Sequence, residues 1–464
     1  MINSQTFYNN DTICGAVLFR YRINRIITRK PMSKKPKLSF WQIWNLSFGF
    51  LGVQIGYSLQ NSNTSTIFES LGADVSHLSY FWLAAPLAGM VIQPIVGMFS
   101  DGTWTRFGRR IPYILGGALI STLALMLMPN CPTLLALAPL AMGAFILLFM
   151  DLSFNVTMQP FRALVADMLD DSQKTEGYVV QTFLINIGAV IGAVLPLIMT
   201  WFGVSDEAVP GQVSSHIAWS YYIGGAVLLA TVLVTAFKTR EYPPKEFAEY
   251  NGLAVEEGPA EKTSFMTLLR NTPSAMVRLG ITQFFSWAAL FIMWTYLKPA
   301  ITGSVTDGGV VLSEGATQTW VGVLNGVYPI PACIAALFMT KLASRFGNKP
   351  VYASCLLFGA VGFAGLVLLK DKYALMLPML CIGIAWAGIL AMPYAILSRA
   401  VDPKRMGVYM GIFNFTITIP QIVIGLTGGV IVKYCFGSNA VMMLALACVF
   451  MLLAALSVAF VREK

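Results

Sequence analysis

The sequence predicts an all-α protein that crosses a membrane about twelve times and consists of two halves of six helices. Three observations predict this fold class. Of the 464 residues, 56% are hydrophobic and only 11% are charged. The apolar residues form long runs, and about 20 such residues are enough for a helix to span the roughly 30 Å hydrocarbon core. Basic residues are concentrated in alternate connectors, and stretches of the first half return in the second.

Twelve apolar runs are long enough to span. In chain order we expect the spans at residues 40–62, 78–100, 111–130, 133–161, 176–202, 217–237, 275–300, 317–340, 349–370, 373–398, 405–432 and 439–461. The seven cysteines are scattered singly, so neither a disulfide framework nor a zinc site is expected. No metal and no bound cofactor is predicted.

The net charge of +9 indicates topology. Connectors on the side of the N-terminus hold 27 of the 31 Lys and Arg residues. Basic residues accumulate on the cytoplasmic side of membrane proteins, so both termini are predicted to be cytoplasmic. An even number of spans follows, and the positive charge carries no implication of nucleic-acid binding.

The longest internal connector divides the spans six and six. The sequence RFGRRIPY at 106–113 returns as RFGNKPVY at 345–352. Parallel repeats of six spans are the plan of major facilitator transporters, whose substrate site lies midway between the halves. We therefore expect that fold, with a basic cytoplasmic tail at 1–38, an N-terminal half at 39–237, a cytoplasmic linker at 238–274 and a C-terminal half at 275–464.

Glycines four residues apart let helix backbones approach closely in a membrane. Packing is therefore the predicted role of four pairs: Gly52 and Gly56, Gly188 and Gly192, Gly322 and Gly326, Gly407 and Gly411.

Asp151 lies well inside the fourth predicted span, after the apolar stretch 137–150. A carboxylate at a helix centre costs roughly 2.5–3.5 kcal/mol on insertion scales, so it is normally kept only beside a cavity or relay. Asn155, Gln159 and Arg162 follow it on one stripe of the helix. We hypothesise that Asp151 binds and releases one proton per transport cycle. The alternative is a structural hydrogen bond to a neighbouring helix.

Arg162 is about 16 Å along the helix axis from Asp151, too far for a direct ion pair on a straight helix. Two roles remain open for it. The guanidinium either holds a loop beside Asp167, Asp170 and Asp171 or donates hydrogen bonds to sugar hydroxyls.

Sugar recognition requires many hydrogen-bond donors and acceptors beside flat apolar faces. Amide and aromatic side chains within the spans provide both, which favours a neutral polyhydroxy substrate. A single aromatic at membrane depth is more often a packing residue or an interface anchor. The candidates for substrate binding are Arg162, Gln54, Gln60, Asn155, Asn186, Gln283, Trp287, Asn325, Tyr328, Asn414 and Gln421, with Trp294 and Trp386 as further aromatics.

Several motifs resemble the sucrose-transporter branch of the glycoside-pentoside-hexuronide:cation symporters. The most specific is DLSFNVTMQPFRALVAD at 151–167, and others are GVQIGYSLQ at 52–60 and the stretch 387–421. The resemblance implies that Asp151 couples a proton to transport, that Arg162 is important, and that the substrate is sucrose, maltose or a related glucoside. It also implies a cytoplasmic gating motif formed by Asp101, Arg106, Gly108, Arg109 and Arg110.

One departure from the wider family concerns the coupling ion. The sodium-using melibiose branch carries paired aspartates in its second span, whereas residues 78–100 contain none. Proton coupling is therefore favoured over sodium coupling.

The predicted function is proton-coupled import of a disaccharide by alternating access. A sodium-coupled symporter, a sugar exporter and a non-transporting sugar sensor remain alternatives. A membrane enzyme would need a cluster of His, Cys or carboxylate residues near one face, and the sequence offers none. We expect a monomer in a lipid bilayer, with sugar and proton as its partners. Short loops and a compact linker favour the inner membrane of a bacterium.

Overall fold

The computed structural model describes residues 34–71, 78–134, 138–207, 211–253 and 264–461. Most of the predicted tail, residues 1–33, and part of the predicted linker, residues 254–263, lie outside the described residues. The described residues fall into two units, one comprising 34–36 with 242–253 and the other comprising the described residues of 37–241 and 264–461. In the smaller unit, α9 (Pro244–Tyr250) is a short helix, and the rings of Tyr242 and Tyr250 meet edge to face at 5.0 Å.

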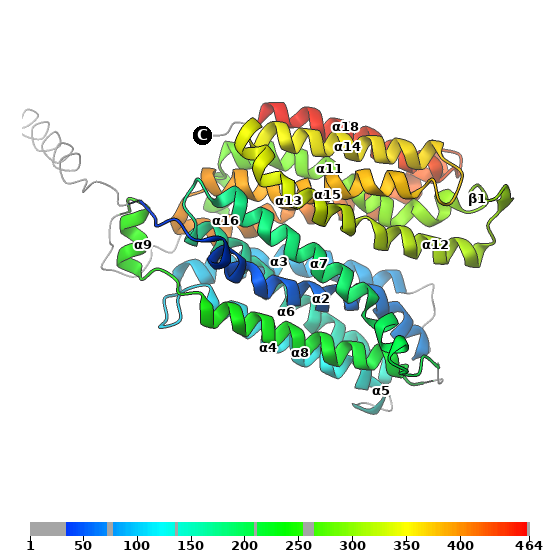
Figure 1. Cartoon of the computed structure of the whole chain (residues 1–464), viewed down its shortest axis with the longest axis horizontal. Helices are drawn as coiled ribbons and strands as arrows, with labels where there is room; N and C mark the ends of the chain where they lie inside the picture. Colours follow the sequence, from blue (N-terminus) through cyan, green and yellow to red (C-terminus); the bar gives the residue numbers. More distant parts are fainter. Residues whose placement is uncertain (1–33, 72–77, 135–137, 208–210, 254–263, 462–464) are drawn as a thin grey trace, which may run out of the picture. The chain divides into compact units, whose positions relative to one another are not determined.

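The larger unit is a bundle of membrane-spanning helices (Figure 1). In its described part, ten helical segments are long and apolar enough to span a membrane, and α2 and α3 complete the predicted twelve. The N-terminal half consists of α2 (Phe40–Ser70), α3 (Leu78–Gly102), α4 (Ile111–Leu127) with α5 (Cys131–Leu134), α6 (Pro139–Met168), α7 (Lys174–Trp201) and α8 (Ser215–Lys238). The C-terminal half consists of α11 (Ser274–Ile301), α12 (Glu314–Val327) with α13 (Pro329–Phe346), α14 (Asn348–Leu368), α15 (Met376–Ala400), α16 (Met406–Phe413) with α17 (Phe415–Val430), and α18 (Val441–Ser457). The short helix α10 (Phe265–Arg270) precedes α11, and a two-stranded hairpin of β1 (Thr306–Asp307) and β2 (Val310–Val311) follows it.

Local sequence explains where these helices begin and break. Ser39 and Gln42 form a capping box at the start of α2, in which each side chain accepts a hydrogen bond from the other residue's backbone N–H. The eighth span is divided into α12 and α13 at Tyr328. Pro329 and Pro331 lack the N–H groups that a continuous helix would use there, and their rings crowd the preceding turn.

Small residues set the helix spacing within and between the halves. A Cβ added to Gly52 would lie 2.1 Å from the Thr231 hydroxyl, and one added to Gly188 would lie 2.4 Å from the Leu51 carbonyl oxygen. The packing prediction is confirmed for these pairs and for Gly407 and Gly411, which approach α3. It is wrong for Gly322 and Gly326, because no atom lies within 4 Å of a Cβ added to either.

The two halves contact each other near one end of the bundle. The connectors at 103–110, 169–173 and 401–405 lie at this end, which we call the basic end; the hairpin β1–β2 and α5 lie at the other (Figure 1). Here α16 packs on α3, while α13 and α15 pack on α7. The broken helices thus contribute their basic-end segments, α13 and α16, to the contact between the halves.

Candidate functional site

Asp151 lies near the middle of the long helix α6 and is 1% exposed. The Gln60 amide of α2 donates a 2.5 Å hydrogen bond to its Oδ1. Its Oδ2 is buried and has no hydrogen-bond partner among the described residues. A carboxyl group in this setting has one oxygen free to take a proton or to accept a hydrogen bond from a ligand.

A group of amide side chains continues from Asp151 toward the C-terminal half. The Asn155 amide donates to the Asp151 carbonyl at 2.7 Å and accepts a hydrogen bond from Gln93 of α3 at 2.7 Å. A Cβ added to Gly89 would lie 2.9 Å from Asn155 Oδ1 and 3.3 Å from Asn414 Nδ2. Asn155 of the N-terminal half and Asn414 of the C-terminal half therefore both lie beside Gly89. Gln93 Oε1 and Asn414 Nδ2 have no partner among the described residues.

An aromatic cluster lies on the C-terminal side. Trp386 of α15 meets Trp287, Trp294 and Tyr328 edge to face, with ring centroids 5.5, 5.9 and 6.0 Å away. Edge-to-face arrangements of this kind are favourable and hold the rings in defined orientations. Trp287 Nε1 is buried without a partner in the described part of the chain. Tyr57 of α2 meets Phe154 of α6 edge to face, with ring centroids 5.8 Å apart.

Arg162 contacts the C-terminal half through Tyr394 of α15. Its Nη1 donates to the Tyr394 hydroxyl, and its guanidinium carbon lies 4.5 Å from the centre of that ring. Tyr178 of α7 stacks on Tyr394 at 5.9 Å and donates to the Arg162 carbonyl at 3.0 Å. In the sequence, QPFRAL at 159–164 is similar to MPYAIL at 392–397, which aligns Phe161 with Tyr394. This similarity does not indicate that Tyr394 contacts the arginine.

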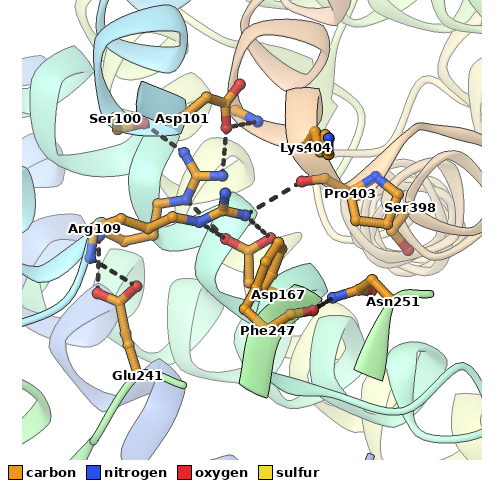
Figure 2. A network of polar contacts seen from close by, with 12 residues as sticks. Ser100, Asp101, Arg109, Asp167, Glu241, Phe247, Asn251, Ser398, Pro403 and Lys404 are labelled. Carbon is orange, nitrogen blue, oxygen red and sulfur yellow. Dashed lines mark hydrogen bonds and ion pairs between the residues drawn. The ribbon is translucent and has the colours of Figure 1, made fainter. Parts of the chain in front are cut away.

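The predicted gating motif forms a buried ion network at the basic end (Figure 2). Arg109 and Arg110 both bind Asp167, with contacts of 2.7 and 2.8 Å. Arg110 also binds Asp101 at 2.6 Å. Both arginines are at most 2% exposed. Arg106 does not enter this network; it is exposed, and its guanidinium lies 4.7 Å from the Phe107 ring.

Glu241, three residues after α8, also belongs to this network, and the sequence did not indicate its participation (Figure 2). Its carboxylate accepts the backbone N–H groups of Arg109, Arg110 and Ile111 at 3.1, 2.8 and 2.9 Å, which satisfies donors at the start of α4. Burial raises the pKa of Glu241, and the three donors oppose that shift. Gly108 permits the contact because its φ is +107° and an added Cβ would lie 2.4 Å from Glu241 Oε1.

The network reaches the C-terminal half through Asp101. Its two carboxylate oxygens accept the backbone N–H groups of Gly407 and Val408, each at 2.8 Å, at the first turn of α16. Gln159 donates to the Gly407 carbonyl, and Arg109 Nη2 donates to the Pro403 carbonyl at 3.3 Å. The basic end is thereby closed between α3 and α16.

A second contact closes the basic end beside α7. Lys174 donates to the Ser398 carbonyl at 2.8 Å, and Arg399 donates to the Thr175 hydroxyl at 2.9 Å. Thr175 in turn donates to Asn348 at 3.1 Å. The halves are therefore joined by polar contacts on both sides of the bundle at this end.

The remaining candidates are distributed over both halves. Gln54 packs beside Gly188 of α7, and the Asn186 amide donates to the Thr182 carbonyl at 2.8 Å. Gln283 accepts hydrogen bonds from Tyr352 at 3.1 Å and Ser286 at 3.4 Å, within the C-terminal half. Asn325 Oδ1 is buried without a partner among the described residues, and Gln421 is half-buried on α17. Their roles in substrate binding stay predictions.

Known proteins share the fold and much of the length of this chain. The family model described as MFS/sugar transport protein matches residues 67–432. A sucrose transport protein of Arabidopsis thaliana is 24% identical over 448 residues, which cover 88% of this chain and 86% of the relative. A sucrose transport protein of Oryza sativa subsp. indica is 25% identical, covering 82% and 79%. The general alpha-glucoside permease of Schizosaccharomyces pombe is 26% identical over 309 residues, covering 61% and 53%.

Solved structures agree on the architecture. A crystal structure of the major facilitator transporter FucP in the outward conformation superposes with a TM-score of 0.68 at 14% identity, covering 92% of this chain and 99% of that one. The proton:xylose symporter XylE gives a TM-score of 0.68 at 13% identity, covering 91% and 96%. These likenesses establish the twelve-helix fold that the repeats predicted.

Proposed function

Because the chain belongs to the MFS/sugar transport family, as its motifs predicted, we propose that it imports a disaccharide or related glucoside together with a proton. It is a sugar transporter rather than an enzyme. The observation that carries the finer proposal is the Asp151 carboxyl group, which is buried at mid-helix with one oxygen unpaired in the described structure.

Asp151 has the properties that proton coupling needs. A buried carboxylate without a cationic partner is costly, and protonation removes that cost. Among the described residues, the side chain that hydrogen-bonds to it, Gln60, is neutral. Protonation and deprotonation therefore change the local charge by one unit beside the amides that are proposed to hold the sugar.

The proposed sugar site lies between the amide group and the aromatic cluster. Buried polar atoms normally have a hydrogen-bond partner, so buried atoms without one mark positions where a ligand or water can form the missing hydrogen bond. Such atoms come from both halves: Asp151 Oδ2, Gln93 Oε1, Asn414 Nδ2 and Trp287 Nε1. The Trp386 cluster supplies flat apolar surface for the sugar ring, and the names of the plant and yeast relatives suggest sucrose or an alpha-glucoside as substrate.

The orientation is proposed from the charges. The basic end would face the cytoplasm with both termini, because basic connectors stay on that side. Closure of this end by Asp101 and Lys174 would then leave the protein in an outward-facing state, ready to receive sugar from outside. We propose a monomer in the bilayer. A bacterial inner membrane is proposed only from the short connectors, since the relatives named above come from plants and yeast.

Uptake into liposomes tests substrate and coupling together. Wild-type protein, Asp151→Asn and the matched control Asp206→Asn, an exposed loop carboxylate, are given radiolabelled sucrose or maltose with an inward proton gradient. With one proton per sugar, one pH unit drives about tenfold accumulation at most. Wild type and Asp206→Asn should accumulate one sugar, whereas Asp151→Asn should only equilibrate it.

Other outcomes would redirect the proposal. Gradient-driven accumulation that survives in Asp151→Asn would give Asp151 a structural role. Accumulation driven by a sodium gradient instead of a proton gradient would identify the other ion. Net movement only into inverted vesicles, whose lumen corresponds to the outside of the cell, would indicate an exporter. Binding without movement would indicate a sensor.

A further inference from the structure

An apolar groove runs along the outside of the C-terminal half. It has a volume of about 570 Å³ and lies between the start of α11 and the junction of α16 with α17. The residues that line it are almost all apolar: Leu269, Thr272, Met276, Val277, Gly280, Ile281, Phe284, Phe285, Ile412, Phe415 and Thr416. Val277 is 55% exposed and Ile281 is 49% exposed, so the groove opens outward from the bundle.

The groove exists because α16 leans on α3 rather than on α11. Of α16 and α17, only α17 packs closely on α11, and a Cβ added to Gly280 of α11 would lie 3.1 Å from Thr416 Cγ2 of α17. Gly280 and Thr416 thus form a floor of small residues, with Phe284 and Phe415 beside it. A neighbouring side chain does not fill this space, and in a membrane the adjoining solvent is hydrocarbon.

The length and position of the groove fit one lipid acyl chain. The lining residues of α11, from Met276 to Phe285, cover about 14 Å of helix rise, and one leaflet contributes about 15 Å of hydrocarbon. The groove begins at α10, at the basic end, and runs toward the middle of the bundle. Its volume falls within the range of sites that hold small organic ligands, about 300–1,000 Å³.

The charge at the mouth of the groove selects the head group. Arg270 ends α10 beside Leu269, is exposed, and forms no ion pair in the described part of the chain. Arg278 follows on the first turns of α11, where its guanidinium donates to the Phe460 carbonyl at 3.2 Å. The sequence from 262 to 306 contains no Asp or Glu. Clustered basic residues at a membrane surface attract anionic lipids. We propose that this groove binds one anionic phospholipid, with an acyl chain along α11 and the head group at Arg270.

Lipid retention by the full-length protein tests the proposal without reference to transport. Purified protein is mixed with phosphatidylglycerol or phosphatidylcholine of identical chains, and bound lipid is counted by native mass spectrometry. Ile281→Trp fills the groove, and Arg270→Gln removes the head-group contact. The matched controls are Val361→Trp, a residue of α14 that is 62% exposed and does not line the groove, and Lys341→Gln, an exposed cation of α13.

Wild type and both controls should retain one phosphatidylglycerol. Arg270→Gln should weaken the binding of phosphatidylglycerol about fivefold, which is the effect of one basic residue near a membrane surface. Wild type should likewise bind phosphatidylcholine more weakly than phosphatidylglycerol, by about the same factor. Ile281→Trp should abolish the specific retention while the protein keeps its elution volume and melting temperature. Equal retention by Ile281→Trp and Val361→Trp would overturn the proposal, as would equal binding of the two lipids by wild type.

Discussion

Replacing Asp101 with Ala should open the basic end of the protein. The carboxylate joins the halves through two hydrogen bonds to α16, from the N–H groups of Gly407 and Val408, each at 2.8 Å. It also binds Arg110, which belongs to the same half as Asp101. That ion pair survives when the halves separate, so among the contacts of Asp101 only the two bonds to α16 distinguish the closed from the open basic end.

The size of the effect follows from these two bonds. A hydrogen bond to a charged group contributes about 1.5–3 kcal/mol, so the pair favours the closed basic end by about 3–6 kcal/mol. Because about 1.4 kcal/mol corresponds to a factor of ten, the substitution should shift the equilibrium toward the open basic end by a factor of about 10² to 10⁴. Loss of the contact between Asp101 and Arg110 destabilises both states and does not enter this ratio.

Double electron–electron resonance measures the shift directly. Spin labels at Ser172→Cys, before α7, and Ser344→Cys, near the end of α13, report across the basic end; both residues are exposed. Both labels are introduced into a chain without native cysteines. With the wild-type Asp101, a short distance between the labels should dominate. In Asp101→Ala, a longer distance should dominate. Asp402→Ala is the control, since this exposed carboxylate binds the N–H of Lys404 within its own half. An unchanged distance distribution in Asp101→Ala would refute the reasoning.

Three further predictions concern the packing of Gly411, the helix cap at Glu241 and the aromatic cluster around Trp386. Gly411→Val should also favour the longer distance, because an added Cβ would lie 2.5 Å from the Gln93 carbonyl oxygen, whereas Gly322→Val should leave the distribution unchanged because nothing lies within 4 Å of its Cβ. Glu241→Ala should lower the free energy of unfolding by about 1 kcal/mol, the usual effect of losing a helix N-terminal cap; a melting temperature equal to wild type would count against the role of its three hydrogen bonds. Trp386→Ala should weaken sugar binding about 2- to 10-fold and Trp386→Phe much less, because an aromatic contact contributes about 0.5–1.5 kcal/mol; equal affinities by calorimetry would exclude the cluster from the site.

Much of the candidate site could be predicted from the sequence because each signal lay in a single stretch. Asp151 was recognisable as a carboxylate within an apolar run, and Arg109 and Arg110 as a short basic turn. In the structure both arginines belong to a buried ion network. Gln93 and Glu241 were missed because an amide in a span and an acid after a span are common, and only their partners distinguish them.

The sequence by itself determined the number of spans, their alternation and the two-half plan. The length of an apolar run and the placement of Lys and Arg are local properties of the chain. They determine for each span separately whether it crosses the membrane and in which direction. Only the tertiary structure decided which faces meet. Gln60 and Asp151 are 91 residues apart, and Arg162 and Tyr394 are 232 apart. Helical periodicity fixes the face on which a residue lies, but the partner of that face depends on how the helices cross, which small residues such as Gly411 permit.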